Sequence, residues 1–114
     1  MDQCQELAVG SVLPSLGRIV ELRKIADGVY WVTTVEHGGY VFHVSVVEGL
    51  LSPSAQEYGV LDLDRWVCYE EDCAWSIVAL EYPEWQESAA RQDVALEMAK
   101  SEYPEYLRKR GLLV

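Results

Sequence analysis

The sequence of 114 residues lacks the features that mark several large classes of protein. No apolar run approaches the ~20 residues that a helix needs to cross a bilayer. The three cysteines are an odd number, which excludes a complete disulfide framework. The first residues are acidic and lack the basic start of a signal peptide. These absences predict a cytoplasmic protein with reduced thiols and no membrane contact.

Basic side chains are also scarce, since nine Lys and Arg stand against nineteen Asp and Glu, a formal net charge of −10. Residues 25–90 hold twelve acids and one base, Arg65, a net −11, while the remainder holds seven acids and eight bases, a net +1. This charge argues against direct nucleic-acid binding and against an anionic membrane. The excess of acids either keeps the protein soluble or forms a surface complementary to a basic partner, such as a protein with a groove that otherwise holds nucleic acid.

The first half of the chain has the composition of a β-sheet. Residues 19–25, 29–35 and 40–47 are rich in β-branched and aromatic side chains, and the middle stretch is apolar on both faces. Asp27-Gly28 suits a tight hairpin turn, and so does the pair Gly38-Gly39. A fourth strand or an extended connector is expected at 60–64. The simplest arrangement is a small antiparallel sheet of three to four strands.

The second half has the periodicity of helices. Glu70, Glu71 and Asp72 suit the positive end of a helix that Pro83 stops. Further helices are expected at 88–102 and 105–110, with a short one at 54–58, whereas residues 1–17 form a weakly patterned arm. The chain is therefore predicted to be one α+β domain, residues 1–114, in which two to three C-terminal helices pack against the sheet. The helix over the acidic run has an apolar stripe formed by Trp75, Val78, Ala79 and Tyr82.

Candidate catalytic and metal-binding groups are few. His37 and His43 with Cys68 and Cys73 are zinc ligands by type, but their spacings differ from those of common zinc modules. The pairs Asp62/Asp64 and Glu70/Asp72 lack the nearby lysine of a nuclease-like site, and no phosphate-binding glycine loop is present. We therefore expect no metal, no cofactor and no catalytic residue. The alternative is a small hydrolase or nuclease that uses His37 with Asp72 or Cys73.

Aromatic side chains are numerous, with four Trp and seven Tyr. Tyr30, Trp31 and Trp75 are expected in the core. Trp85 follows Pro83-Glu84 and is either a partly exposed anchor for a partner or a cover over the end of a helix.

Two motifs give the chain a family resemblance. Residues 31–39 follow the pattern Trp-Val-x-Thr-x-x-His-Gly-Gly, and residues 69–75 follow Tyr-Glu-Glu-Asp-x-x-Trp, with Tyr103-Pro104 further on. Together they resemble an uncharacterised family of small domains encoded by phages, plasmids and integrated elements, over roughly residues 31–104. A Leu-Ser segment of that family corresponds here to either Val44-Ser45 or Leu51-Ser52, so the loop after the third strand differs.

The resemblance implies a mobile-element protein, and small acidic proteins of that origin include anti-CRISPR inhibitors of host defence. The expected function is therefore a non-enzymatic inhibitor in the bacterial cytoplasm that blocks the basic surface of a host protein or ribonucleoprotein, a CRISPR effector above all, by mimicking nucleic acid. The sequence leaves the oligomeric state open. The acidic run has an equally valid structural role, in which it caps its helix and bonds the turn formed by His37, Gly38 and Gly39. Trp31 and Trp75 belong to the same structural motif. The expected contacts are Glu36, Glu48, Asp62, Asp64, Glu70, Glu71, Asp72 and Trp85.

Overall fold

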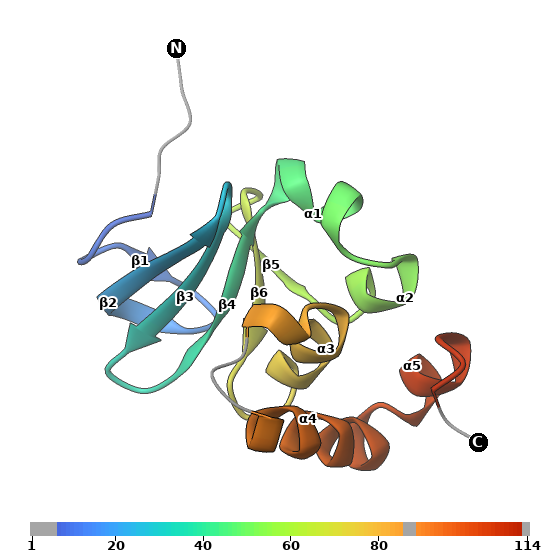
Figure 1. The fold of residues 1–114 in the computed structure, drawn as a ribbon. Coiled ribbons are helices and arrows are strands. Elements are labelled where there is room, and N and C mark those ends of the chain that lie inside the picture. Colours follow the sequence, from blue (N-terminus) through green and yellow to red (C-terminus); the bar gives the residue numbers. More distant parts are fainter. Residues whose placement is uncertain (1–6, 86–88, 113–114) are drawn as a thin grey trace.

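The computed structural model describes residues 7–85 and 89–112 and shows one antiparallel sheet with helices packed on it (Figure 1). The α+β class is confirmed, but the sheet has six strands rather than three to four, in the order β1-β2-β3-β4-β6-β5. The predicted hairpin at Asp27-Gly28 joins β2 to β3. The strands are β1 Val12–Leu13, β2 Gly17–Ala26, β3 Val29–Thr34, β4 Gly38–His43, β5 Val60–Asp62 and β6 Trp66–Glu70.

Two segments that the sequence did not assign to the sheet account for the larger number of strands. Part of the N-terminal arm forms β1, which pairs with the start of β2. Residues Trp66–Glu70 form β6, which lies between β4 and β5. Glu70 therefore ends a strand, and the helix that was expected to start at the acidic run begins only at Trp75.

Side chains of the central strands alternate between two apolar clusters, because successive residues of a strand point to opposite faces. The prediction that the middle strand is covered on both faces is confirmed. The face that packs on the helices presents Val29, Tyr40, Phe42, Val67 and Tyr69. The opposite face presents Tyr30, Val32, Val41, Trp66 and Cys68, which pack with Leu7, Leu13, Leu16 and Ile19.

The helices follow one another along one face of the sheet. Helix α3 contacts β4 and β6, α4 packs on α3, and α5 packs on α4 (Figure 1). No helix in the described ranges is both long and apolar enough to cross a membrane. The helical segments are α1 Val44–Leu50, α2 Pro53–Gln56, α3 Trp75–Glu81, the 3-10 turn η1 Pro83–Trp85, α4 Ala89–Glu102 and α5 Pro104–Lys109.

The expected strand over 40–47 stops at His43, and residues 44–47 are helical. The imidazole of His43 is the reason, since its Nδ1 accepts a hydrogen bond from the backbone N–H of Ser45 at 3.2 Å and so caps α1. The expected short helix at 54–58 is α2, which Ser52 caps through a 3.1 Å bond from the N–H of Ala55 to its Oγ.

A buried carboxylate joins the two edges of the sheet. Asp62 lies at the end of β5 and is only 5% exposed. Its Oδ2 accepts hydrogen bonds from the N–H of Ser15 at 2.9 Å and from the Oγ of Ser15 at 2.7 Å. Because Ser15 lies between β1 and β2, at the opposite edge, the sheet curls almost into a barrel around its second apolar cluster.

A second buried carboxylate fixes the helices. The side chain of Glu81, at the end of α3, is 4% exposed. It accepts hydrogen bonds from the N–H and the Oγ of Ser52 at 2.8 and 2.9 Å, and from the Oη of Tyr106 at 2.6 Å. Arg110 donates to the same carboxylate at 2.5 Å. Glu81 thus connects α3 to the start of α2, to the middle of α5 and to the residue that ends α5.

The contact between Asp62 and Ser15 can be tested by removing the carboxylate. We expect Asp62→Ala to lower the free energy of unfolding by about 2 kcal/mol, because a hydrogen-bonded charge inside the fold is lost. Glu48→Ala is the matched control, since it removes the same charge from an exposed position of α1. Urea unfolding of both variants measures the difference, and equal stability of the two would contradict a role for Asp62 in closing the sheet.

Buried protonated groups predict a loss of stability at high pH. Burial raises the pKa of the Cys68 thiol to about 12, and it raises the pKa of Tyr103 to about 12, with the charge of Cys73 as the next cause. Both groups hold their protons more tightly in the folded state. Their contribution is therefore complete below the unfolded values of ~8.5 and ~10 and is lost as pH rises toward 12.

We expect the free energy of unfolding to be level near pH 8 and to fall above about pH 9, by up to ~1.4 kcal/mol per pH unit for each group. Urea unfolding between pH 8 and 11 measures this slope. In Cys68→Ala the fall above about pH 9 should be shallower than in wild type, because one of the groups with a raised pKa is removed. A level profile up to pH 11 in the wild-type protein would show that these groups do not titrate differently in the two states.

Candidate functional site

The turn between β3 and β4 holds His37 by its backbone. The N–H of Thr34 donates to the carbonyl of His37 at 2.7 Å, and the Oγ1 of Thr34 accepts from the N–H of His37 at 2.9 Å. The same hydroxyl contacts the carbonyl of Leu16 at 2.9 Å, which ties the turn to the start of β2. His37 itself is half-buried, so its ring lies at the surface of a well-fixed turn.

The double glycine after His37 allows β4 to approach β6 closely. A Cβ atom at Gly39 would lie 2.6 Å from the carbonyl oxygen of Tyr69, and one at Gly38 would lie 2.7 Å from Oε1 of Glu71. The N–H of Glu71 donates to the carbonyl of Gly38 at 2.8 Å. Close packing on the backbone of β6 therefore requires glycine at position 39, and the His-Gly-Gly turn lies directly against the acidic run.

Within the acidic run, the side chain of Glu70 folds back on the segment that follows it. Its carboxylate accepts hydrogen bonds from the backbone N–H groups of Asp72 at 2.6 Å, Cys73 at 3.0 Å and Ala74 at 3.2 Å. These bonds shape the residues that lead into α3. The structural role considered for the acidic run is thus present for Glu70 and for the backbone of Glu71.

The carboxylates of Glu71 and Asp72 are exposed, and they meet the ring of His37. One ligand atom from each of the three residues lies within 4.8 Å of the others. Two segments that are 34 residues apart in the sequence therefore bring together an imidazole and two carboxylates. Such a set can accept protons, bind a cation or attract the basic side chains of a partner.

The thiol of Cys73 lies next to this cluster but is a poor nucleophile. Its pKa is raised, first by burial and then by the charges of Glu102, Glu70 and Asp72. A raised pKa leaves little thiolate near neutral pH, and the thiolate is the reactive form. The same shift shows that Glu102 adds its negative charge to this end of the molecule.

The other expected contacts do not join this cluster. Asp62 was expected at the surface but is buried, because its carboxylate bonds Ser15. Glu48 follows β4 in α1, and Asp64 precedes β6, so both lie at the His43–Trp66 end of these strands. Gly39 and Glu70 pair at the other end of these strands. At the usual rise per strand residue, the two ends are some 13–17 Å apart.

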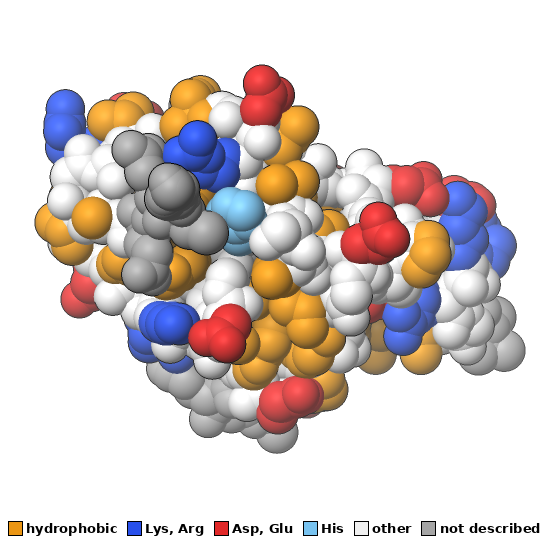
Figure 2. Space-filling view, turned by 90° about the horizontal axis from the view of Figure 1, so that it is seen from above, with side chains coloured by type: hydrophobic (Ala, Val, Ile, Leu, Met, Phe, Trp, Pro, Cys, Tyr) orange, Lys and Arg blue, Asp and Glu red, His pale blue; other side chains and the backbone are white. Residues whose placement is uncertain are grey.

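The acidic residues therefore do not converge on one face. Seen from above, Asp and Glu side chains lie in separate spots among basic and apolar ones (Figure 2). The two histidines are separated in the same way, since His43 and the turn of His37 lie at opposite ends of β4, which excludes one zinc site that contains both.

Trp85 covers the core rather than standing free as an anchor. Its ring stacks on Tyr82 at 4.0 Å with planes 8° apart, and it also contacts the rings of Tyr40 and Phe42. Of the aromatic residues in the two motifs, Trp75 is buried and Trp31 is half-buried against Tyr40. Trp85 therefore matches the alternative in which it covers a helix end.

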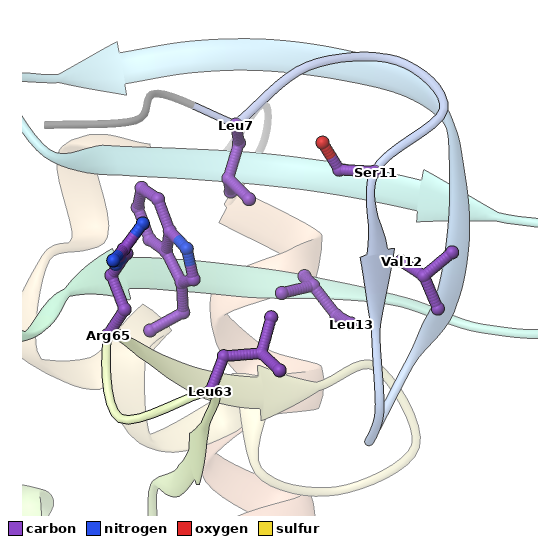
Figure 3. A pocket seen from close by; sticks show the side chains of 7 residues that line it. Leu7, Ser11, Val12, Leu13, Leu63 and Arg65 are labelled. Atoms are coloured by element: carbon purple, nitrogen blue, oxygen red, sulfur yellow. The ribbon is translucent and has the colours of Figure 1, made fainter.

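A small pocket opens where the edges of the sheet meet (Figure 3). It encloses about 220 Å³, less than the ~300–1,000 Å³ of typical ligand sites, and it contains no His, Asp or Glu. Its walls come from the N-terminal segment and from the turn before β6. They include Leu7, Val12, Leu13, Leu63, Arg65 and Trp66.

The close approach of β4 and β6 can be tested at Gly39. We expect Gly39→Ala to lower the free energy of unfolding by about 1–3 kcal/mol, because the new methyl group meets backbone atoms of Tyr69 and Glu70 that cannot rotate away. Gly49→Ala is the control, since a Cβ at this position in α1 meets nothing within 4 Å and should leave stability equal or up to ~1 kcal/mol higher. Thermal unfolding compares the two, and a Gly39→Ala protein as stable as wild type would refute the packing requirement.

Comparisons with known proteins identify the family and nothing more specific. No curated protein and no solved structure matches the chain. The model of one family, the domain of unknown function DUF7007, matches residues 16–111 and so includes the His-Gly-Gly turn, the acidic run and all the helices. The chain therefore belongs to the DUF7007 family.

Proposed function

We propose that this protein is an inhibitor that binds a basic host partner through the acidic end of its sheet, defined here as Glu36, Glu71 and Asp72 around His37. The observation that supports this proposal is that all three carboxylates are exposed and form no ion pair in the part of the chain that the structure describes. In the ranges that the structure describes, no Lys or Arg forms an ion pair with any of these three acids. Several other acids of the fold are paired or hydrogen-bonded, whereas these three carboxylates lie close together in the fold or in the sequence.

The paired acids make the contrast clear. Asp27 pairs with Lys24, Glu57 with Lys109, Glu97 with Lys100, Glu105 with Arg108 and Glu81 with Arg110. Asp62 and Glu70 are occupied by hydrogen bonds within the fold. Five of the nine Lys and Arg residues thus form ion pairs with acids outside the acidic end. Glu102 and Glu70 also carry negative charge near the acidic end, since the charges of both residues raise the pKa of Cys73.

The proposed mechanism is steric and electrostatic. Lys and Arg side chains that hold phosphates on the partner would bind the carboxylates instead, in the manner of a nucleic-acid mimic. Long-range attraction would speed the encounter at low salt and weaken it at high salt. No catalytic step is required, which fits the raised pKa of the Cys73 thiol.

The partner class follows from the charge and from the resemblance to mobile-element domains. A ribonucleoprotein of the CRISPR effector type has the required basic surface, and it would be met in the cytoplasm of a bacterial host. Among the contacts expected from the sequence, only Glu36, Glu71 and Asp72 remain in this proposal. Glu48 and Asp64 are exposed at the other end of the sheet and serve better as controls.

A hydrolase or nuclease is the second candidate, because His37 and Asp72 do come together. Within this candidate the imidazole and the carboxylates are favoured over Cys73, because the raised pKa of its thiol leaves less of the reactive thiolate. Loss of an activity in His37→Gln, with folding retained, would favour it over the inhibitor.

The inhibitor proposal is tested with the triple variant Glu36→Gln/Glu71→Gln/Asp72→Asn and a purified CRISPR effector complex. We expect the association rate, measured by surface plasmon resonance, to fall by about tenfold or more relative to wild type. Raising the salt from about 50 to 200 mM should weaken wild-type binding steeply and the binding of the variant far less.

The matched control is Asp27→Asn/Glu48→Gln/Asp64→Asn, which removes three charges from exposed positions at the opposite end of the sheet. It should bind within about threefold of wild type, because only general attraction is reduced. Equal losses in the two triple variants would show that net charge alone matters. Binding by the first variant that equals wild type would refute the acidic end as the contact surface.

A further inference from the structure

We propose that His37, Glu71 and Asp72 bind a divalent first-row cation, with Mn²⁺ as the best-matched ion and water in the remaining coordination positions. This inference is independent of the proposed partner, because it concerns the chain alone. It rests on three properties of these side chains: their close spacing, their chemical type, and the lack of hydrogen bonds or ion pairs to them among the described residues.

The geometry fits a single ion. Ligand atoms on opposite sides of a cation with bonds of about 2.0–2.6 Å stand ~4–5 Å apart. The nitrogen of His37 and the oxygens of Glu71 and Asp72 all lie within 4.8 Å of one another. Atoms at these separations can therefore all serve as ligands of one ion placed between them.

The imidazole distinguishes this set from an ordinary acidic cluster. His37 contributes a nitrogen ligand from the β3–β4 turn, while both carboxylates come from the segment after β6. An imidazole with two carboxylates on one side of an ion leaves positions open for water or a substrate. Carboxylates and water suit Mn²⁺, and the imidazole favours it over Ca²⁺ or Mg²⁺, which prefer oxygen ligands alone.

The three side chains are uncommitted to the fold. Within residues 7–85 and 89–112, no hydrogen bond or ion pair engages the ring of His37 or the carboxylates of Glu71 and Asp72. The two negative charges therefore repel each other with no counter-charge bonded to them. A bound cation would remove this repulsion and satisfy all three groups at once.

The backbone beneath the ligands is fixed, which limits the cost of binding. The bonds to Thr34 hold His37, the bond to Gly38 holds Glu71, and the carboxylate of Glu70 holds the N–H of Asp72. Only side-chain rotations remain to be ordered when an ion enters.

The test is a titration of the full chain with MnCl₂, followed by isothermal calorimetry and by loss of the electron paramagnetic resonance signal of free Mn²⁺. Manganese is the preferred probe because the cysteine thiols bind it weakly, whereas Zn²⁺ would also bind thiolates. We expect one saturable site in the wild-type protein. Each of His37→Gln, Glu71→Gln and Asp72→Asn should weaken binding by about tenfold or more.

Glu36→Gln is the matched control, because it neutralises an exposed acid of the same turn that is outside the ligand set. It should bind Mn²⁺ within about threefold of wild type. Absence of saturable binding up to about 1 mM Mn²⁺ would refute the site. Unchanged affinity in His37→Gln would also refute it, since that result indicates general attraction to carboxylates. Neither result bears on the partner, which is absent from the titration.

Discussion

The close approach of β4 to β6 at the double glycine is the constraint on which the rest of the structure depends. A side chain at Gly39 would meet the backbone of Tyr69, so only glycine lets these two strands pair in their observed register. That pairing joins strands β2, β3 and β4 to β6, and β6 in turn pairs with β5. It also fixes the start of the acidic run against the His-Gly-Gly turn, through the bond from the N–H of Glu71 to the carbonyl of Gly38. The fold and the candidate site therefore have the same origin.

The carboxylates of this acidic protein have two distinct roles. The carboxylates of Asp62, Glu70 and Glu81 each accept several hydrogen bonds within the fold, and those of Asp62 and Glu81 are buried. The burial of Asp62 and Glu81 is tolerated because hydrogen-bond donors within the fold satisfy their carboxylates. The carboxylates of Glu71 and Asp72 are exposed beside His37, and no donor among the described residues bonds them. Net charge alone does not separate these roles, since a carboxylate inside the fold contributes nothing to a contact surface.

Local signals in the sequence predicted the parts of the fold that depend on neighbouring residues. The Asp27-Gly28 turn, the long helix α4 and the stop of α5 near Gly111 are of this kind. Strand β6 was missed because its residues are buried on both faces and show no alternation of polar and apolar types. Asp62 and Glu81 were missed as interior groups because Ser15 and Tyr106, their partners, are 47 and 25 residues away. The two motifs did indicate that His37 and the acidic run belong together, but only the register of β4 with β6 shows which carboxylates face the ring.

The two proposals for this end of the molecule have the same physical basis, which is the repulsion between the neighbouring carboxylates of Glu71 and Asp72. Two carboxylates that repel each other at the surface are stabilised by any positive charge that can reach both. A lysine or arginine of a partner brings that charge with a large contact area, and its attraction is screened by salt. A divalent cation brings twice the charge to a point where an imidazole is also available, and its bonds are short and directional. Because Glu71 and Asp72 belong to both sets, an ion bound there would reduce the charge offered to a basic partner. The concentration of free metal would then determine how strongly the acidic end attracts a basic surface.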